Sequence, residues 1–454
     1  MTLKQDKVKL MSLFCGGLIF LTLIVSLTAW ATKHAIYGGP RFSKTFRQCV
    51  LQVAGFIPKA KSTITILDHV RPPRGVLNLY SNYFVSAGNL TANTGYLLVP
   101  RLRFDGVNEV LLVNTSNGMQ RSIFTDLNHR NSVNYSDVLS ASEAKRVGSI
   151  SSRNRLFHPI LIKSGLLVYL IPSNDLIAVD LKDATEEKWR IRGSFHHSIE
   201  TDYDGNLWVC GSVEPGQLDF NGSKSSHSNY SYDDQCMVKV SVDGKILDAI
   251  SVSDLVVGCG LEYLLYGLSN PDSIFDPIHI NQITPIVRDS GVFRRGQLLI
   301  SLRNLSTILL FDPKSRKVVW HKSGPWMNQH CVMFTDDSKF SVLDNHSFAS
   351  GEYWFNSNWR TRIISQDIAT DSIEEVVFNR ESPRKFRIPI EGRALPLGGE
   401  SWLIEDCLNG TIMVFRKQKL VFKWSNIYPD KTVGISSWCR YMTLDQVPES
   451  MLLN

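Results

Sequence analysis

The sequence predicts an all-β protein, a β-propeller of about six blades, preceded by one N-terminal transmembrane helix. Two observations predict the propeller. After about residue 76, short apolar runs alternate with turns of Gly, Asn, Asp and Ser, which is the pattern of strands. A unit of similar composition also recurs along this region. A third observation, an uncharged stretch near the start of the chain, predicts the transmembrane helix.

The uncharged stretch runs from Leu10 to Ala31. It is long enough to cross a hydrocarbon core of about 30 Å as a helix. We interpret residues 1–33 as a membrane anchor. The stretch ends in Ala-Trp-Ala, which resembles a small-residue cleavage site, so a removed signal peptide is the alternative.

Residues 34–75 are predicted to form an amphipathic helix and a linker. Phe42, Phe46, Val50 and Val53 recur at helical spacing. Such a helix packs on the following domain or lies on the membrane surface. A Pro-Pro pair flanked by arginines at 71–74 then indicates the linker.

Residues 76–454 are predicted to form the propeller domain. Its repeating unit is a glycine, two strands, a turn centred on Asp, a third strand and a tryptophan. Copies run from Gly165 to Trp189, from Gly296 to Trp320 and from Gly399 to Trp424. A single unit cannot bury both of its faces, so several must stack around an axis. At about 40–50 residues per blade, the region holds six or seven. A pair of β-sandwiches is the alternative. Helices are expected only near 136–146 and 253–268.

Charge and cysteine content exclude several classes. The net charge of +6 is spread along the chain, which gives no reason to expect a nucleic-acid partner and is compatible with small anionic substrates. Eight cysteines form no CxxC pair, which disfavours a zinc ribbon. Since neither a Walker-type loop nor a Gly-x-Gly-x-x-Gly fingerprint opens a helix, we expect no nucleotide cofactor.

Three histidines have similar settings at predicted strand starts. His197 and His330 are each followed eight positions later by a turn and then by another apolar strand. His279 likewise precedes an apolar stretch, and Arg303 follows the strand after it. Equivalent strand starts of a propeller face the same end of the central channel. We therefore expect these four side chains to converge on one pocket.

The chemistry of this set favours an oxyanion. Three imidazoles suit zinc, so a His-ligated zinc hydrolase is one alternative. An arginine beside them adds positive charge next to a cation, whereas its planar fork matches two oxygens of a tetrahedral anion. Histidine is also a competent covalent nucleophile. The residues therefore favour transfer of a phosphoryl-like or sulfuryl-like group, with no metal.

Several short motifs stand in an order that resembles the arylsulfotransferases, the PAPS-independent aryl-sulfate sulfotransferases. The motifs are His279-Ile280-Asn281, Ser301-Leu302-Arg303, Asp312 to Trp320, Gln329-His330 and Leu343-Asp344-Asn345. The resemblance implies a six-bladed propeller on the exported side of a membrane, periplasmic, lumenal or extracellular. It also implies a ping-pong transfer from an aryl sulfate to a phenol through a sulfohistidine.

Carried over by position, the resemblance makes His330 the nucleophile and His279 and Arg303 the sulfuryl-binding residues. His197 matches the third active-site histidine, although the adjacent His196 can take that place. Asn281 is a candidate for orienting the site.

The chain also departs from the family. Cys331 stands where the family often has Asp, and Leu-Arg-Asn-Leu around Arg303 stands where it often has Ser-Arg-His-Gln. A non-catalytic, membrane-tethered binding platform is therefore a further alternative. Trp326, Phe195 and Tyr203 are candidates to line an aromatic acceptor pocket, with core packing as the alternative for each.

Overall fold

The computed structural model describes residues 95–103, 107–126, 155–162, 165–171, 175–213, 234–267, 276–346, 360–376, 388, 390–407, 409–428 and 434–451. Contacts divide the chain into Met1–Ile66 and Leu67–Asn454, and every described residue belongs to the second unit. The predicted anchor over 1–33, and the helix and linker over 34–75, lie outside the described residues. In the described part, no helix is long and apolar enough to span a bilayer.

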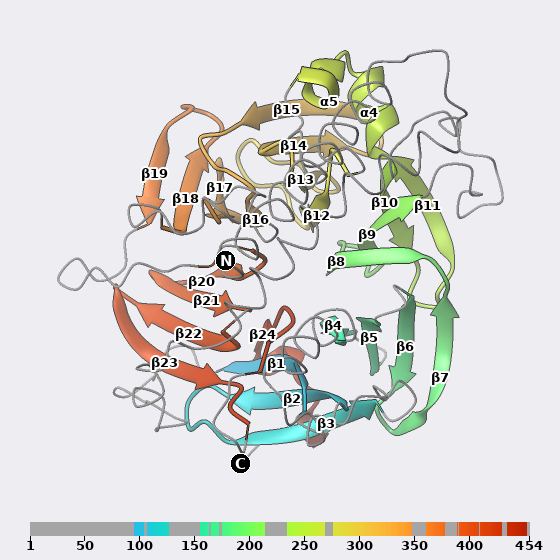
Figure 1. Ribbon diagram of the computed structural model, residues 1–454, viewed down its shortest axis with the longest axis vertical. Coiled ribbons are helices and arrows are strands. Elements are labelled where there is room, and N and C mark those ends of the chain that lie inside the picture. The colour runs from blue at the N-terminus through green and yellow to red at the C-terminus, as the bar shows by residue number, and fades with distance from the viewer. Residues whose placement is uncertain are drawn as a thin grey trace, which may run out of the picture. The chain divides into compact units, whose positions relative to one another are not determined.

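The described residues form six antiparallel sheets of four strands each, arranged around a common centre (Figure 1). This confirms the predicted six-bladed propeller. We number the blades by the sequence order of their strands. In each blade one strand lies innermost, and three more follow it outward.

The strands have the following bounds. Blade 1 contains β1 (Gly95–Leu102), β2 (Asn108–Asn114), β3 (Gln120–Asp126) and the C-terminal β24 (Arg440–Thr443). Blade 2 contains β4 (Phe157–Leu161), β5 (Leu166–Leu170), β6 (Leu176–Asp180) and β7 (Asp183–Ile191). Blade 3 contains β8 (Ser194–Thr201), β9 (Leu207–Val213), β10 (Asp234–Val240) and β11 (Ile246–Ser251).

Blade 4 contains β12 (Ile280–Pro285), β13 (Leu298–Leu302), β14 (Thr307–Asp312) and β15 (Lys317–Ser323). Blade 5 contains β16 (His330–Asp336), β17 (Lys339–Asp344), β18 (Arg362–Asp367) and β19 (Ile373–Val376). Blade 6 contains β20 (Arg393–Gly398), β21 (Ser401–Asp406), β22 (Thr411–Arg416) and β23 (Lys419–Ser425).

The helical segments are α4 (Val252–Gly258), α5 (Glu262–Gly267), η5 (Leu444–Gln446) and η6 (Glu449–Met451). The first two confirm the helix expected near 253–268, whereas the one expected near 136–146 lies outside the described residues. Ser251 caps α4 by accepting a hydrogen bond from the Asp254 backbone N–H at 3.0 Å, as Ser does at helix starts.

The repeat found in the sequence corresponds to the three outer strands of blades 2, 4 and 6. Gly165 and Gly296 precede the second strand with φ of 84° and 92°, a conformation that favours glycine over residues with a Cβ. The recurring tryptophans Trp189, Trp320 and Trp424 lie on the outermost strands. The innermost strands are not part of this repeat.

Ring closure joins the two ends of the propeller. The C-terminal β24 pairs antiparallel with β1, with Tyr96 opposite Met442 and Leu98 opposite Arg440. Blade 1 therefore takes its innermost strand from the end of the chain and its other three strands from the beginning. Pairing of this kind removes a free sheet edge and ties the first blade to the last.

The apolar core lies mainly between neighbouring blades. Leu112 of blade 1 and Leu167 of blade 2 share one cluster, and Val209 of blade 3 packs with Val168 of blade 2 in the next. These side chains are at most 1% exposed, and burying each one contributes about 1.5–3 kcal/mol. Each blade thus stabilises its neighbours.

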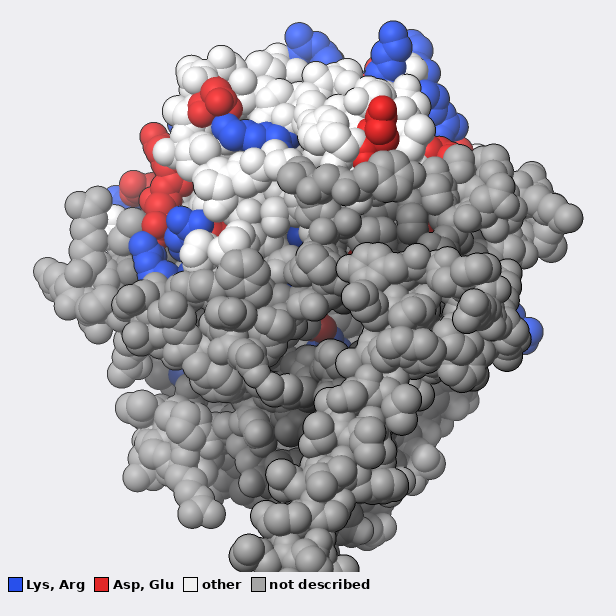
Figure 2. Space-filling view, turned by 45° about the horizontal axis from the view of Figure 1, so that its top comes forward, with Lys and Arg blue, Asp and Glu red and all other residues white. Residues whose placement is uncertain are grey.

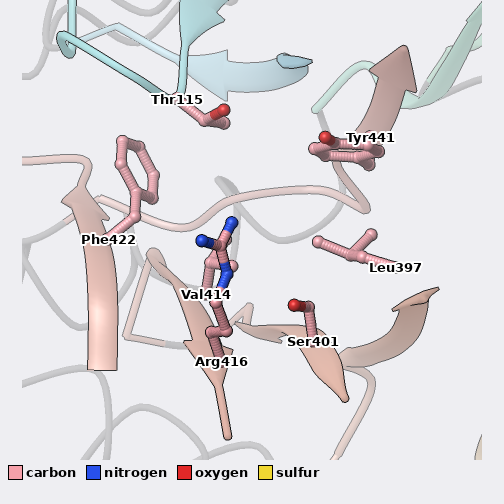
Figure 3. Close-up of a pocket in the computed structure, with 7 residues that line it drawn as sticks. All are labelled: Thr115, Leu397, Ser401, Val414, Arg416, Phe422 and Tyr441. Atoms are coloured by element: carbon pink, nitrogen blue, oxygen red, sulfur yellow. The ribbon is translucent and has the colours of Figure 1, made fainter. Parts of the chain in front are cut away.

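Two cavities lie away from the centre. Figure 3 shows one between blades 6 and 1, bordered by Phe422, Arg416 and Tyr441. Its volume of ≈ 10 Å³ is enough for about one water. The other, of ≈ 330 Å³, lies at the turns of blades 3 and 4. On the described surface of the face in Figure 2, Lys and Arg are interspersed with Asp and Glu.

Candidate active site

The centre of the propeller is built from the starts of the six innermost strands. Near each start one residue that is not glycine has a left-handed backbone. These residues are His158, His197, His279, Cys331, Glu391 and Trp438, with φ between 45° and 66°. In blades 2 to 5 the strand pairing shifts register at the same place. A bulge of this kind re-aims side chains, and such strained conformations cluster at functional sites.

The predicted histidines meet at this centre. The ring centroids of His197 and His279 are 4.9 Å apart, and those of His197 and His330 are 6.0 Å apart. The His196 ring stacks on His279 at 6.3 Å. Imidazoles from blades 3, 4 and 5 therefore form one cluster.

Arg303 is held beside this cluster by its own backbone and a neighbour. Its N–H donates to the His279 carbonyl at 3.0 Å, and its Nη1 donates to Asn304 Oδ1 at 2.6 Å. The side chain is 7% exposed, and its Nε is buried with no acceptor among the described residues. A buried donor of this kind is costly unless a ligand satisfies it.

The strand pairing corrects one detail of the prediction. The register shift falls between His196 and Ile199 in blade 3, and between His330 and Met333 in blade 5. His196, not His197, therefore holds the position that corresponds to His330. Because the bulge adds two residues in blade 3 and one in blade 5, spacing along the sequence could not fix this register.

Asn345 fixes the tautomer of His330. Asn345 Nδ2 donates to two backbone carbonyls, those of Ile388 at 2.7 Å and Glu391 at 2.8 Å. Its Oδ1 is therefore the acceptor that faces His330 Nδ1 at 2.7 Å. The proton must then lie on Nδ1, which leaves the lone pair on Nε2 of His330. The role of Asn345 was not predicted, although its motif was part of the family resemblance.

The other histidines are also oriented through Nδ1. His279 Nδ1 donates to the carboxylate of Asp276, three residues upstream. His196 Nδ1 and His197 Nδ1 lie 2.8 Å apart and share a hydrogen bond. Asp276 was not singled out from the sequence, although a carboxylate three residues before a candidate histidine is a usable signal.

Asn281 holds the backbone next to His330. Its Nδ2 donates to the Gln329 carbonyl at 2.7 Å. Gln329 in turn donates through Nε2 to Ser301 Oγ at 3.0 Å and to the Leu302 carbonyl at 3.2 Å. These bonds hold the residue before His330 against the strand before Arg303.

Burial and nearby positive charge favour the neutral imidazoles of His196, His197 and His330. Burial lowers the pKa of His330 well below its ordinary value, and the nearby Arg303 guanidinium lowers it further. Burial also lowers the pKa of His197 strongly, followed by the effect of His279. The pKa of His196 falls to about 4, again mainly through burial. A neutral His330 is the nucleophilic form.

A second charged network lies beside the cluster. Glu200 accepts hydrogen bonds from Arg393 Nη2 at 3.1 Å and from Arg440 Nη1 at 2.7 Å. Both arginines also donate to His158 Nε2, at 2.7 and 2.8 Å. Burial and these two cations lower the pKa of His158 well below its ordinary value. Residues from blades 1, 2, 3 and 6 are joined here.

Aromatic rings do line the site, but not those proposed from the sequence. Trp438 lies 5.7 Å from His197 and 6.2 Å from His330, and Phe157 lies 6.1 Å from His197. Trp438 precedes the closing strand, and its Nε1 is buried without a partner among the described residues.

The three proposed aromatics lie elsewhere. Phe195 and Trp326 are each 1% exposed and pack in the apolar clusters between blades. Tyr203 is 45% exposed and stacks with Arg295 at 4.8 Å, at the larger of the two outer cavities. Core packing was thus the correct alternative for the first two.

No group of three or more His, Cys, Asp or Glu side chains in the described ranges is placed to hold a metal ion.

Cys331 is fully buried and contacts the Ala394 carbonyl at 3.5 Å. It therefore packs against blade 6.

Comparisons with known proteins agree with the sequence motifs. The family described as Arylsulfotransferase (ASST) matches residues 173–426. No curated protein matches the chain.

Solved structures are similar only at a low level. A protein of unknown function from Bacteroides caccae has a TM-score of 0.45 at 11% identity, covering 77% of this chain and 99% of its own. Hydrazine synthase from Kuenenia stuttgartiensis has a TM-score of 0.40 at 10% identity, with coverages of 73% and 80%. Virginiamycin B lyase from Staphylococcus aureus has a TM-score of 0.38 at 9% identity, with coverages of 75% and 88%. Similarity this low carries no functional argument.

Proposed function

From the premise that this chain belongs to the arylsulfotransferase family, we propose that it moves a sulfuryl group from an aryl sulfate to a phenol. His330 carries the group as a sulfohistidine between the two steps. The family supports sulfotransferase activity in general. The covalent route rests on the site residues.

The observation that carries the proposal is the hydrogen bond between His330 and Asn345. It places the ring proton on Nδ1, so that Nε2 is free to attack sulfur. The depressed pKa of His330, caused first by burial, keeps this nitrogen unprotonated at neutral pH. A solvated imidazole, with an ordinary pKa near 6.5, would be partly protonated there.

The donors beside Nε2 fit the oxygens of a sulfuryl group. Arg303 Nε is a buried donor without a partner among the described residues. His279, whose Nδ1 is bonded to Asp276, donates from its remaining ring nitrogen, Nε2, when both ring nitrogens carry a proton. Donors fixed in a dry site stabilise the charge that builds up on sulfuryl oxygens at no cost in reorganisation.

The reaction then has two displacements. His330 Nε2 attacks sulfur, the bond from sulfur to the aryl oxygen breaks, and a phenolate leaves. The oxygen of a second phenol next attacks sulfur, its proton passes to a base, and the electrons of the N–S bond return to Nε2. This scheme needs neither a metal nor a nucleotide donor.

The test is His330→Ala, assayed for transfer from p-nitrophenyl sulfate to phenol. We expect transfer to disappear, while the wild-type protein gains one SO3 on a peptide containing His330 when incubated with donor alone. Transfer by the variant at an undiminished rate would disprove the role of His330. A wild-type protein that gains no SO3 from several aryl sulfates would instead support the non-catalytic platform.

We further propose that residues 1–33 anchor the protein in a membrane with the propeller on the exported side. The uncharged stretch from Leu10 to Ala31 supports this. Membranes from expressing cells should retain the protein after an alkaline carbonate wash. Release by the wash would contradict the anchor.

A further inference from the structure

Four residues form one wall of the site. Arg155, Phe157, Glu391 and Trp438 lie near the starts of the innermost strands of blades 2, 6 and 1. The rings of Phe157 and Trp438 are 5.3 Å apart, and the Arg155 guanidinium lies 5.0 Å above the Phe157 ring. We call these four residues the aryl wall.

The aryl wall adjoins the histidine cluster on two sides. Both of its rings contact His197, at 6.1 Å from Phe157 and 5.7 Å from Trp438. The Glu391 backbone carbonyl accepts from Asn345, the residue that orients His330. The wall and the nucleophile are therefore held by one connected set of contacts.

One carboxylate oxygen of Glu391 has no hydrogen-bond partner among the described residues. Its Oε1 pairs with Arg155, whereas its Oε2 is buried and has no hydrogen-bond partner among the described residues. The side chain is only 19% exposed. A buried carboxylate oxygen left unpaired is costly, and the residue also has a left-handed backbone with φ of 56°. Such features persist where a ligand supplies the missing partner.

The chemistry of the unpaired atoms differs across the site. On the side of Arg303, the unpaired atom is a donor, Nε, which suits sulfuryl oxygens. On the aryl wall, the unpaired atoms are Glu391 Oε2, an acceptor that suits an O–H, and Trp438 Nε1, a donor. A phenol acceptor has both an aromatic face and one O–H, so it matches the wall.

We propose that the aryl wall binds the phenol acceptor and that Glu391 is the general base that removes its proton. The inference rests on the proposed sulfuryl transfer. As the phenol oxygen forms its bond to sulfur, the N–S bond breaks and its electrons return to His330 Nε2. The phenol proton passes to Glu391 Oε2 and then to solvent. In the reverse reaction, protonated Glu391 donates its proton to the oxygen of a departing phenolate that is a poor leaving group.

The acidity of the acceptor provides the test. A phenol that is ionised at neutral pH has no proton to lose and needs no base, whereas phenol itself does. We would compare full-length wild type with Glu391→Gln, using p-nitrophenyl sulfate as donor and either phenol or pentafluorophenol as acceptor. Transfer to phenol should fall about 10²–10⁴-fold in the variant, and transfer to pentafluorophenol should fall far less.

The half-reactions separate this inference from the proposed function. The variant should still release a burst of p-nitrophenolate from the donor alone, because that leaving group departs without a proton. Equal losses with both acceptors, or no loss with either, would overturn the role of Glu391. A wild-type protein without any burst would instead overturn the proposed function.

Two further variants complete the experiment, one as a control and one as an independent test. Glu375→Gln removes a carboxylate that pairs with Arg360 on the outer face of blade 5, and it should behave as wild type. Phe157→Leu removes an aromatic face while leaving Glu391 in place, so the test survives if Glu391→Gln fails to fold. We expect the KM for phenol to rise about threefold to tenfold, and an unchanged KM would overturn the wall as the acceptor site.

Discussion

His330 Nδ1 lies 2.7 Å from Asn345 Oδ1, and the Asn345 amide is itself held by the carbonyls of Ile388 and Glu391. An amide fixed in this way can only accept from the imidazole. The ring nitrogen that keeps its lone pair is thus chosen by a residue that directly follows the neighbouring strand β17, and not by the histidine motif alone.

Replacing Asn345 should impair sulfohistidine formation. In Asn345→Leu the imidazole loses the acceptor that fixes its proton on Nδ1, so we expect the burst rate to fall about 10–100-fold. Asn345→Asp keeps an acceptor at this position and should retain more activity. Rapid-mixing measurement of p-nitrophenolate release checks both variants, and equal rates in Asn345→Leu and wild type would refute the tautomer argument.

The burst rate should keep its neutral-pH value below pH 6.5. Burial lowers the pKa of His330, so its Nε2 stays unprotonated at pH values where a solvated imidazole is already charged. On a plot of burst rate against pH, the fall on the acid side should therefore have its midpoint below 6.5, the ordinary pKa of histidine. A midpoint at or above 6.5 would show that His330 is solvated or is not the titrating group.

Stability should fall as the pH drops below 6.5. The pKa of His196 falls to about 4, and those of His158 and His197 are also lowered, in each case mainly by burial. Between pH 4 and 6.5 the unfolded chain binds more protons than the folded one, so stability rises with pH across this window. Urea unfolding at pH 7.5 and 5 measures the loss. His158→Gln should reduce the difference between the two pH values.

The network around Glu200 should matter for stability. Glu200→Gln leaves Arg393 and Arg440 without the carboxylate that balances them. Breaking a buried ion pair in this way costs about 3–5 kcal/mol. The exposed pair of Arg360 and Glu375 is the matched control, since Glu375→Gln should cost less than about 1 kcal/mol. Similar unfolding free energies for the two variants would refute the role of the network.

Ring closure should be sensitive to Gly95. A Cβ at this position would meet the Tyr441 side chain, and it would lie 2.7 Å from the Met442 carbonyl oxygen. Gly95→Ala should therefore strain the pairing of β1 with β24 and cost about 1–3 kcal/mol. At Gly258, in α4, a Cβ would meet nothing within 4 Å, so Gly258→Ala should stay within about 0.5 kcal/mol of wild type. A shift of melting temperature in the control alone would contradict this account.

The strands and turns of a blade could be predicted from local sequence patterns. Strands and turns have local requirements, and these produce the alternating apolar runs, the turn glycines such as Gly165 and the recurring tryptophans. Such patterns can be recognised without a structure. The same holds for the chemistry of the site. His279, Arg303 and His330 stand at strand boundaries, where their residue types predict a candidate anion site.

The way in which these parts meet depends on closure of the whole ring. The ladder between β1 and β24 joins residues more than three hundred positions apart, and no local pattern specifies it. The bulges at the strand starts shift the register by two residues in blade 3 and by one in blade 5, so His196 and not His197 corresponds to His330. Asn345, Glu391 and Trp438 acquire their roles only because the closed ring brings the starts of its innermost strands together. Local rules fix strands and turns, whereas hydrogen bonds across the centre depend on packing of the whole ring.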